Sequence, residues 1–268
     1  MLEKCAKIWD ELRKTKPLVH CITNYVTVND VANIILCAGG SPAMVEHPEE
    51  AGQFVNFAQA LYLNLGTLTS EQEAAMLTAS RQAAVKEVPL VIDPVACGVI
   101  PRKLEVLDQI RQTGQITLLK GNIAEIKSLA GLQGQARGVD SMDSGEGLEA
   151  ACRQLAKQEN AIVAATGAID VVASSDQAAQ ISNGSPLFQN ITGAGCMVAG
   201  VMAACIGTPG ADPFMASITG LIAYNIAGER AAARSGENPG TFRQLLFDSL
   251  YNLQGDDILQ EARVRWQI

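Results

Sequence analysis

The chain of 268 residues is long enough to bury a large core, and its 48% hydrophobic residues, 18% charged residues and 24 glycines are typical of a compact globular protein. The net charge of −8 argues against nucleic acid or an anionic membrane surface as a partner. Seven cysteines without a CxxC spacing, together with only two histidines, favour neither a disulfide framework nor a structural zinc site.

The start of the chain does not have the pattern of a targeting segment. Residues 1–17, MLEKCAKIWDELRKTKP, mix both charge signs and contain no apolar core region, so they do not predict a signal peptide. No apolar, uncharged run in the sequence predicts a membrane span. We therefore expect a cytoplasmic protein that has neither a membrane nor a nucleic acid as its partner.

Short apolar runs alternate with helix signals over the first 165 residues. Ser70 with Glu73, and Asn122 with Glu125, each predict a capping box at the start of a helix, and residues 144–159 predict an amphipathic helix. The apolar runs predict strands that are buried on both faces, at 18–23, 60–65, 89–93, 116–119 and 161–165. This alternation predicts an α/β fold, with a mostly parallel central sheet and helices on both of its faces.

The pattern changes after Ala165. Residues 170–174 and 178–182 predict two short strands joined by a Ser-Ser-Asp turn. The final third is helical in pattern and rich in Ala, Gly and Met, which predicts closely packed helices beside the sheet. Because the sequence has no internal repeat and no clear linker, we expect residues 1–268 to form a single domain. A division near residue 160 is the weaker alternative.

The segment 190–200, NITGAGCMVAG, is the first candidate for chemistry. Gly193, Ala194 and Gly195 free backbone N–H groups to face an anion, and the helix that follows adds its positive end. The lysine of a P-loop is absent, so the pattern is weak by itself. The alternative is a glycine-rich turn before a buried helix, with Cys196 as an ordinary core residue.

Polar residues also follow the predicted strands, where ligands bind in parallel sheets. Asp93 and Glu125 both lie just past strands, and two carboxylates beside an anion hole suit a hydrated magnesium ion. A turn or cap remains the alternative for Asp93, and the capping box is the alternative for Glu125. Thr166 and Gly167 leave another strand, where a simple turn is the alternative.

The N-terminal segment predicts an uncharged pocket. Several asparagines, Asn24 among them, crowd around the end of the first strand, and some of them are expected to satisfy turns. The others can line a mainly apolar pocket, with Met44 as an adaptable wall. Uncharged polar groups and a thioether suit a small heterocyclic alcohol better than a sugar phosphate.

Six motifs in this order resemble the hydroxyethylthiazole kinase family of the ribokinase-like superfamily: VHCITNYVTVNDVAN, GGSPAM, VIDPVACG, KGNIAEI, ATGAIDVV and NITGAGCMVAG. The resemblance extends from about residue 17 to about residue 230. It implies a ribokinase-like fold and phosphorylation of the hydroxyl of 4-methyl-5-(2-hydroxyethyl)thiazole by ATP and Mg²⁺, a salvage step toward thiamine. It also implies a homotrimer, with the thiazole site between neighbouring subunits.

The resemblance also implies roles for the residues that match the family's motifs. Met44 and Gly193 match substrate-contacting positions, and Asp93 and Glu125 match the acidic pair near magnesium. Cys196 stands where most ribokinase-like enzymes have an aspartate base and where this family has cysteine.

Two further positions match the part of the family's site that contacts the nucleotide. Thr166 follows its strand as in the family, whereas Lys120 stands where the family usually has arginine. A lysine keeps the positive charge but cannot make the planar, bidentate hydrogen bonds of a guanidinium to phosphate, so we expect a looser contact.

Two other functions stay open at this point. Nucleotide-hydrate dehydratases, which are lyases that use ATP or ADP, share the superfamily, although the uncharged N-terminal pocket disfavours a large dinucleotide. A nucleotide-binding relative that has lost catalysis is the second alternative. The presence of Asp93, Glu125 and the intact Gly-Ala-Gly-Cys sequence favours the kinase over both.

Overall fold

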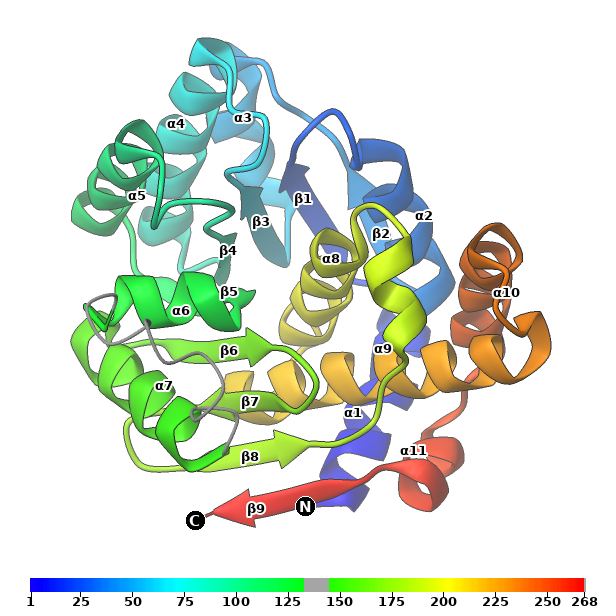
Figure 1. Cartoon of the computed structure of the whole chain (residues 1–268). Helices are drawn as coiled ribbons and strands as arrows, with labels where there is room; N and C mark the ends of the chain where they lie inside the picture. The colour runs from blue at the N-terminus through cyan, green and yellow to red at the C-terminus, as the bar shows by residue number, and fades with distance from the viewer. Residues whose placement is uncertain (133–144, 268) are drawn as a thin grey trace.

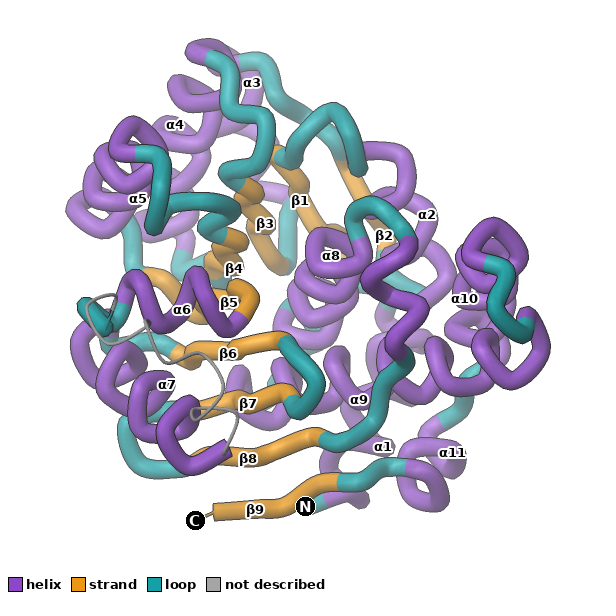
Figure 2. Tube along the Cα trace, viewed as in Figure 1, coloured by secondary structure: helices purple, strands orange, loops and turns teal. Residues whose placement is uncertain are grey.

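The computed structural model describes residues 1–132 and 145–267. Its fold is built around a single mixed β-sheet (Figures 1 and 2). Within this part of the chain the sheet has nine strands. Neighbours pair parallel from β2 to β6 in the sheet order, and β7, β8 and β9 add antiparallel pairs. The order is β2 (Ser41–Ala43), β1 (Leu18–Ile22), β3 (Ala60–Asn64), β4 (Leu90–Asp93), β5 (Ile116–Asn122), β6 (Ile162–Thr166), β7 (Asp170–Ala173), β8 (Ala178–Ile181) and β9 (Val264–Gln267).

Helices cover both faces of the sheet (Figure 1). A separate hydrophobic core lies between the sheet and the helices on each face. Two short 3₁₀ turns, Val55–Phe57 and Pro186–Asn190, complete the described elements. One core contains α3 (Pro48–Phe54), α4 (Ser70–Lys86), α5 (Pro101–Thr113), α6 (Ile123–Leu129) and α7 (Gly145–Glu159). The other contains α1 (Leu2–Thr15), α2 (Val28–Ala38), α8 (Ala194–Ile206), α9 (Pro213–Ser235), α10 (Pro239–Asn252) and α11 (Gly255–Glu261).

Strand β3 contributes side chains to both hydrophobic cores. Successive side chains of a strand point to opposite faces of the sheet. Tyr62 therefore packs in the core with α8, while Leu61 and Leu63 pack in the core with α4. A strand covered on both faces has apolar residues at consecutive positions rather than at every second one. The continuous apolar runs of the sequence have this origin.

The structure confirms the α/β architecture that the sequence predicts, including the five central strands and the helix α7. Ser144, the first residue of that predicted helix, lies outside the described residues. One capping box is confirmed, because Asn122 and Glu125 cap α6 reciprocally. The other is displaced by one residue. The cap of α4 is Thr69 with Gln72, so the prediction of Ser70 with Glu73 was wrong.

Helix α8 is buried among other elements along most of its length, and close backbone approach makes this possible. An added Cβ at Gly220 of α9 would lie 2.8 Å from the Cα of Met202 in α8. A glycine therefore lets the two backbones touch, as the small-residue composition of this region predicts. No helix in the described part of the chain combines the length and the apolar character that a membrane crossing requires.

A buried carboxylate joins the sheet to α9. Asp170 at the start of β7 is 5% exposed; its Oδ1 accepts from the backbone N–H of Gly167 at 2.8 Å, and its Oδ2 accepts from Nδ2 of Asn225 at 2.6 Å. Burial is the largest influence on this group and raises the pKa of Asp170 from the ordinary value of 3.8 to about 6, although both hydrogen bonds act in the opposite direction.

The raised pKa of Asp170 predicts a pH-dependent stability. A carboxyl whose pKa is raised by folding costs nothing below its unfolded pKa, and it destabilises the folded state as the pH rises through the folded pKa. We expect Asp170→Asn, which stays neutral and keeps an oxygen for Gly167, to gain stability relative to the parent between pH 4 and pH 8, by up to about 3 kcal/mol.

Thermal unfolding of both proteins across this pH range provides the measurement. Asp176→Asn is the matched control, because Asp176 is exposed and the change removes the same charge. A difference between Asp170→Asn and the parent that stays constant with pH would contradict the assignment.

Candidate active site

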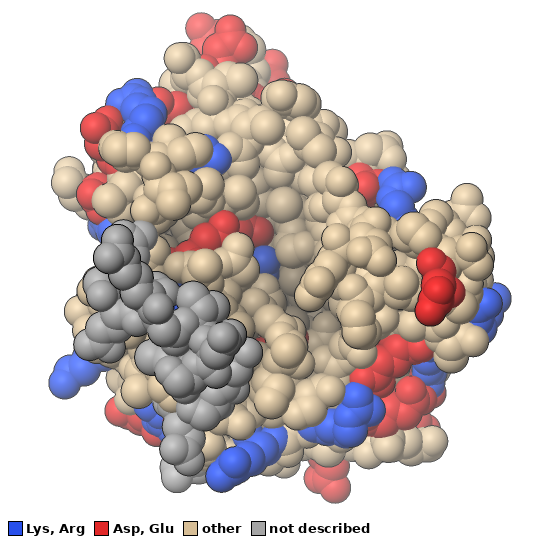
Figure 3. All heavy atoms as spheres, viewed as in Figure 1, with Lys and Arg blue, Asp and Glu red and all other residues tan. Residues whose placement is uncertain are grey.

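Polar side chains converge at the carboxyl ends of the parallel strands. The strands end side by side there, and the register pairs Asn64 of β3 with Asp93 of β4, and Asn122 of β5 with Thr166 of β6. Asn24 lies two residues past β1. The start of α8 reaches the same place through the contacts described below. The face drawn in Figure 3 is hollowed near its centre, and acidic and basic side chains lie in this hollow.

Gly193, the N-cap of α8, has a backbone conformation that favours glycine. Its φ is +79°, and an added Cβ would lie 2.5 Å from the Cγ2 of Thr27. The residue is therefore constrained both by its backbone and by its neighbour. The first N–H groups of an α-helix have no partner within the helix, so the turn of Gly193, Ala194 and Gly195 offers donors for an anion.

Lys120 links the sheet to this turn. Its side chain is 3% exposed; Nζ donates to the carbonyl oxygen of Gly195 at 3.0 Å and lies 3.5 Å from Oδ2 of Asp93. A buried ammonium group is stable only where oxygens surround it. Lys120 therefore places a positive charge beside the first turn of α8. A second cation, Lys103 of α5, donates to the carbonyl oxygens of Gly66 and of Val95, the latter at 3.1 Å.

The two predicted metal carboxylates differ in their surroundings. Asp93 is buried, and this burial raises the pKa of its carboxyl, while the nearby Lys120 lowers it. Glu125 uses both of its oxygens on the backbone: Oε1 accepts from the N–H of Ala96 at 3.0 Å, and Oε2 from the N–H of Asn122 at 2.8 Å. The capping role considered for Glu125 is thus present. Ala96 has a φ of +61°, so Glu125 also holds a strained turn after β4.

The donor set fits magnesium in its usual coordination. Within residues 1–132 and 145–267, no group of three or more His, Cys, Asp or Glu side chains is arranged to hold a metal ion. Mg²⁺ commonly keeps several waters and binds one or two carboxylates together with substrate phosphates. Asp93 and Glu125 are close enough for Glu125 to raise the pKa of Asp93, and they supply two such carboxylates.

Cys196 accepts hydrogen bonds from two side-chain amides. Nδ2 of Asn64 donates to its Sγ at 3.2 Å, and Nδ2 of Asn24 does so at 3.5 Å. Burial, and after it the charge of Asp93, raises the pKa of the Cys196 thiol; Lys120 and the Asn64 amide lower it. The burial outweighs these lowering effects, so the thiol is mostly protonated at neutral pH.

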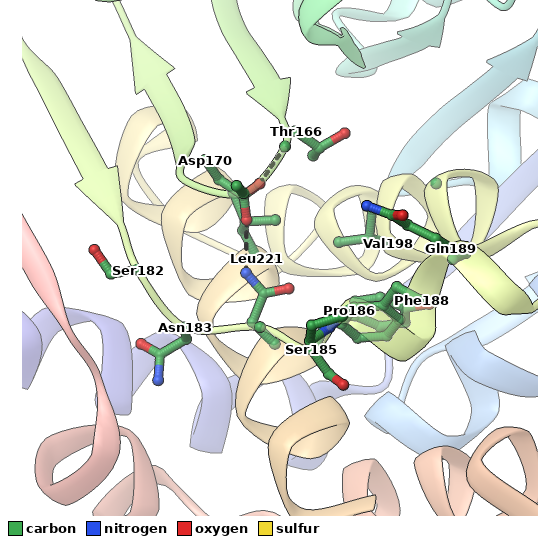
Figure 4. A pocket seen from close by; sticks show the side chains of 17 residues that line it. Thr166, Asp170, Ser182, Asn183, Ser185, Pro186, Phe188, Gln189, Val198 and Leu221 are labelled. Atoms are coloured by element: carbon green, nitrogen blue, oxygen red, sulfur yellow. Dashed lines mark hydrogen bonds between the residues drawn. The ribbon is translucent and has the colours of Figure 1, made fainter. Parts of the chain in front are cut away.

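A cavity of about 430 Å³ lies beside the turn at Gly195 (Figure 4). Thr166 and Asp170 line it from the strand side, and Phe188 lines it from the 3₁₀ turn. The hydroxyl of Thr166 donates to the carbonyl oxygen of Gly121 at 3.3 Å. The ring of Phe188 stacks on Tyr224 with centroids 4.9 Å apart, which gives the cavity a rigid apolar wall.

The structure thus brings together most of the predicted site residues: Asn24, Asp93, Lys120, Glu125, Thr166, Gly193, Ala194, Gly195 and Cys196. Met44 lies one residue past β2, the parallel neighbour of β1, and its side chain is half-buried against the core.

Sequence reasoning missed Asn64, Tyr62, Lys103 and Asp170. Asn64 is the polar residue at the end of an apolar run, and this is the signal by which it could have been found. Lys103 lies on a helix, so its burial is visible only once the fold is known.

Comparisons with known proteins agree over nearly the whole chain. The model of the "Hydroxyethylthiazole kinase family" matches residues 9–256. A hydroxyethylthiazole kinase of Syntrophomonas wolfei is 62% identical over 266 residues, which cover 99% of this chain and 100% of that protein. The solved structure of a hydroxyethylthiazole kinase protein from Pyrococcus horikoshii has a TM-score of 0.90 at 32% identity, covering 98% of this chain and 99% of that one.

A more distant structure shares the fold alone. A ribokinase-like superfamily protein from Enterococcus faecalis has a TM-score of 0.63 at 14% identity, covering 91% of this chain and 93% of that one. The fold alone does not identify the family, but the match to the family model and the full-length identity to the Syntrophomonas wolfei protein do. This chain belongs to the hydroxyethylthiazole kinase family.

Proposed function

We propose that this protein transfers the γ-phosphoryl group of ATP to the hydroxyl of 4-methyl-5-(2-hydroxyethyl)thiazole, a step in thiamine biosynthesis. Membership of the hydroxyethylthiazole kinase family supports this activity. The observation that carries the proposal is the convergence of Lys120, the first turn of α8 and Cys196 at one edge of the sheet. Phosphoryl transfer depends mainly on positioning and on charge stabilisation, which this arrangement supplies.

The phosphates of ATP bind at the first turn of α8. Backbone N–H groups at Gly193 to Gly195 receive the transferred group, and Lys120 adds positive charge beside it. The nucleoside extends into the cavity beside Thr166, which adjoins this turn. Because Lys120 stays bound to Gly195 and Asp93, it acts through its charge rather than through a two-pronged grip on phosphate.

Asp93 and Glu125 are the residues that would hold magnesium. A bound magnesium ion would supply positive charge to neutralise the phosphates of ATP. Glu125 keeps its capping bonds to Asn122 and Ala96, so it contributes through its remaining lone pairs and its charge.

The alcohol approaches from the side of Asn24 and Met44. Its hydroxyl oxygen attacks the γ-phosphorus while the bond to the β-phosphate oxygen breaks, and ADP leaves. Cys196 in its thiolate form takes the hydroxyl proton. Because the transition state of phosphoryl transfer is largely dissociative, this proton leaves late and a sparsely populated base suffices. Gly193 contacts the substrate as well as the phosphoryl group.

The assembly that we propose is a homotrimer in which neighbouring subunits complete the thiazole site. Exposed apolar side chains beside Asn24 and on α2 support an interface there: Tyr25 is 70% exposed, Val26 52% and Leu36 54%.

The activity is tested by measuring ADP release with a panel of small heterocyclic alcohols, with and without magnesium. We expect turnover with the thiazole alcohol only when both ATP and magnesium are present. ATP binding without ADP release from any alcohol would instead favour a non-catalytic relative, and ATP-dependent repair of hydrated NADH would favour the dehydratase alternative.

Substitutions of Cys196 test its role as the base. Cys196→Asp should keep the activity, because a carboxylate accepts a proton at similar size. Cys196→Ala should lower kcat about a hundredfold, with residual turnover from the helix turn and the metal. Cys196→Ser should resemble Cys196→Ala, because an alcohol is harder to deprotonate than a thiol. Steady-state rates at saturating substrates decide the matter: if Cys196→Ala is as fast as the parent, Cys196 only packs.

A further inference from the structure

Asn64 occupies a central place in the site that the proposed reaction does not yet use. It ends β3, which lies between β1 and β4, and it is 1% exposed. A buried side-chain amide costs free energy unless its donors and acceptors are paired. Asn64 pairs all of them: Nδ2 donates to Tyr62 and to Cys196, and Oδ1 accepts from Gly66 and from Asn24.

The direction of these bonds follows from chemistry. The backbone N–H of Gly66 can only donate, and it lies 3.0 Å from Oδ1 of Asn64. The amide nitrogen of Asn64 must therefore face the opposite side, where the Sγ of Cys196 lies at 3.2 Å and the hydroxyl of Tyr62 at 3.0 Å. By the same logic, Asn24 turns its own nitrogen toward Oδ1 of Asn64 at 2.9 Å and toward Cys196.

Two atoms of Cys196 are fixed by this network. Sγ accepts from both asparagine amides, so its own proton points away from them. The hydroxyl of Tyr62, which accepts from Asn64, donates to the carbonyl oxygen of Cys196 at 3.1 Å. Asn64 therefore holds the side chain of Cys196 directly and its backbone, in the first turn of α8, through Tyr62.

We propose that Asn64 is a positioning residue for phosphoryl transfer, which holds the sulfur of Cys196 as a hydrogen-bond acceptor and anchors the first turn of α8 to the end of β3. This inference rests on the proposed function of the same site. It extends that function to a residue that contacts neither the phosphates nor the alcohol and acts through Cys196.

The kinetic test is a double-mutant cycle between Asn64 and Cys196. Asn64→Leu has a similar volume and removes both N–H donors, so kcat should fall about tenfold in the parent, with the KM for ATP changed less than about threefold. In the Cys196→Ala background the same change should cost about threefold or less, because the contact to the sulfur is gone and only the link through Tyr62 to the backbone of α8 remains. Equal losses in both backgrounds would overturn the proposal, since a purely structural role adds in both.

A second measurement does not depend on kinase activity. Alkylation of Cys196 by iodoacetamide at about pH 8 is followed by mass spectrometry in the protein without nucleotide or metal. Because an N–H donor stabilises a thiolate, Asn64→Leu should slow the alkylation of Cys196 about threefold to tenfold. The half-buried Cys37 of α2 is the internal control and should react at an unchanged rate.

The outcomes separate the two proposals. If Asn64→Leu slows the alkylation of Cys196 but the parent protein phosphorylates no alcohol, the proposed function is contradicted and the contact between Asn64 and Cys196 is supported. If the alkylation of Cys196 is unchanged or faster in Asn64→Leu, the proposed role of Asn64 is overturned, whatever the kinase activity. If Asn64→Leu does not give the circular dichroism and thermal transition of a folded protein, Asn64→Ala replaces it. That variant adds no charge beside Cys196 and still removes both donors to Cys196 and Tyr62.

Discussion

The site depends on one buried ion pair. Lys120 is as buried as an apolar core residue, and its ammonium group is stable because Asp93 and the carbonyl oxygen of Gly195 surround it. Asp93 belongs to β4, Lys120 to β5 and Gly195 to α8, so this interaction fixes the distance between the sheet and the first turn of α8. Its loss would leave a buried charge unpaired and free the start of α8.

The same burial explains the chemistry of the cysteine. A helix start favours negative charge, whereas burial disfavours it, and the sequence alone does not decide between the two. In the structure burial prevails, and Cys196 is a mostly protonated thiol within reach of two amide donors. A dissociative phosphoryl transfer tolerates such a weak base, because positioning and charge do most of the work. The cysteine is therefore compatible with a site in which Lys120, the helix turn and Mg²⁺ supply the stabilisation.

Much of this arrangement could be predicted from the sequence, because its signals are local. The apolar runs at β1, β3, β4, β5 and β6 predict strands covered on both faces, and the edge where ligands bind follows from the parallel topology. Asn122 with Glu125 is a cap defined by residue type and spacing. The cap of α4 was misplaced by one residue because Thr69 and Ser70 are both good caps, and only the backbone distinguishes them.

What could not be predicted arises between distant segments. Tyr62 resembles any aromatic residue in a strand, and Asn64 any polar residue at a strand end, until α8 brings Cys196 beside both. The inward direction of Lys120 likewise depends on Gly195, which is 75 residues away in sequence. The antiparallel strand β9 was not predicted, because it pairs at the edge of the sheet with β8, a strand that is distant from it in sequence.

A crystal structure with a non-hydrolysable ATP analogue, magnesium and the thiazole alcohol tests the central claim most directly. The account predicts the γ-phosphate at the backbone N–H groups of Gly193 to Gly195, with Lys120 still bound to Asp93 and the alcohol oxygen between this phosphate and Cys196. A triphosphate bound away from α8, or a Lys120 side chain that leaves Asp93 without reaching the phosphates, would contradict it.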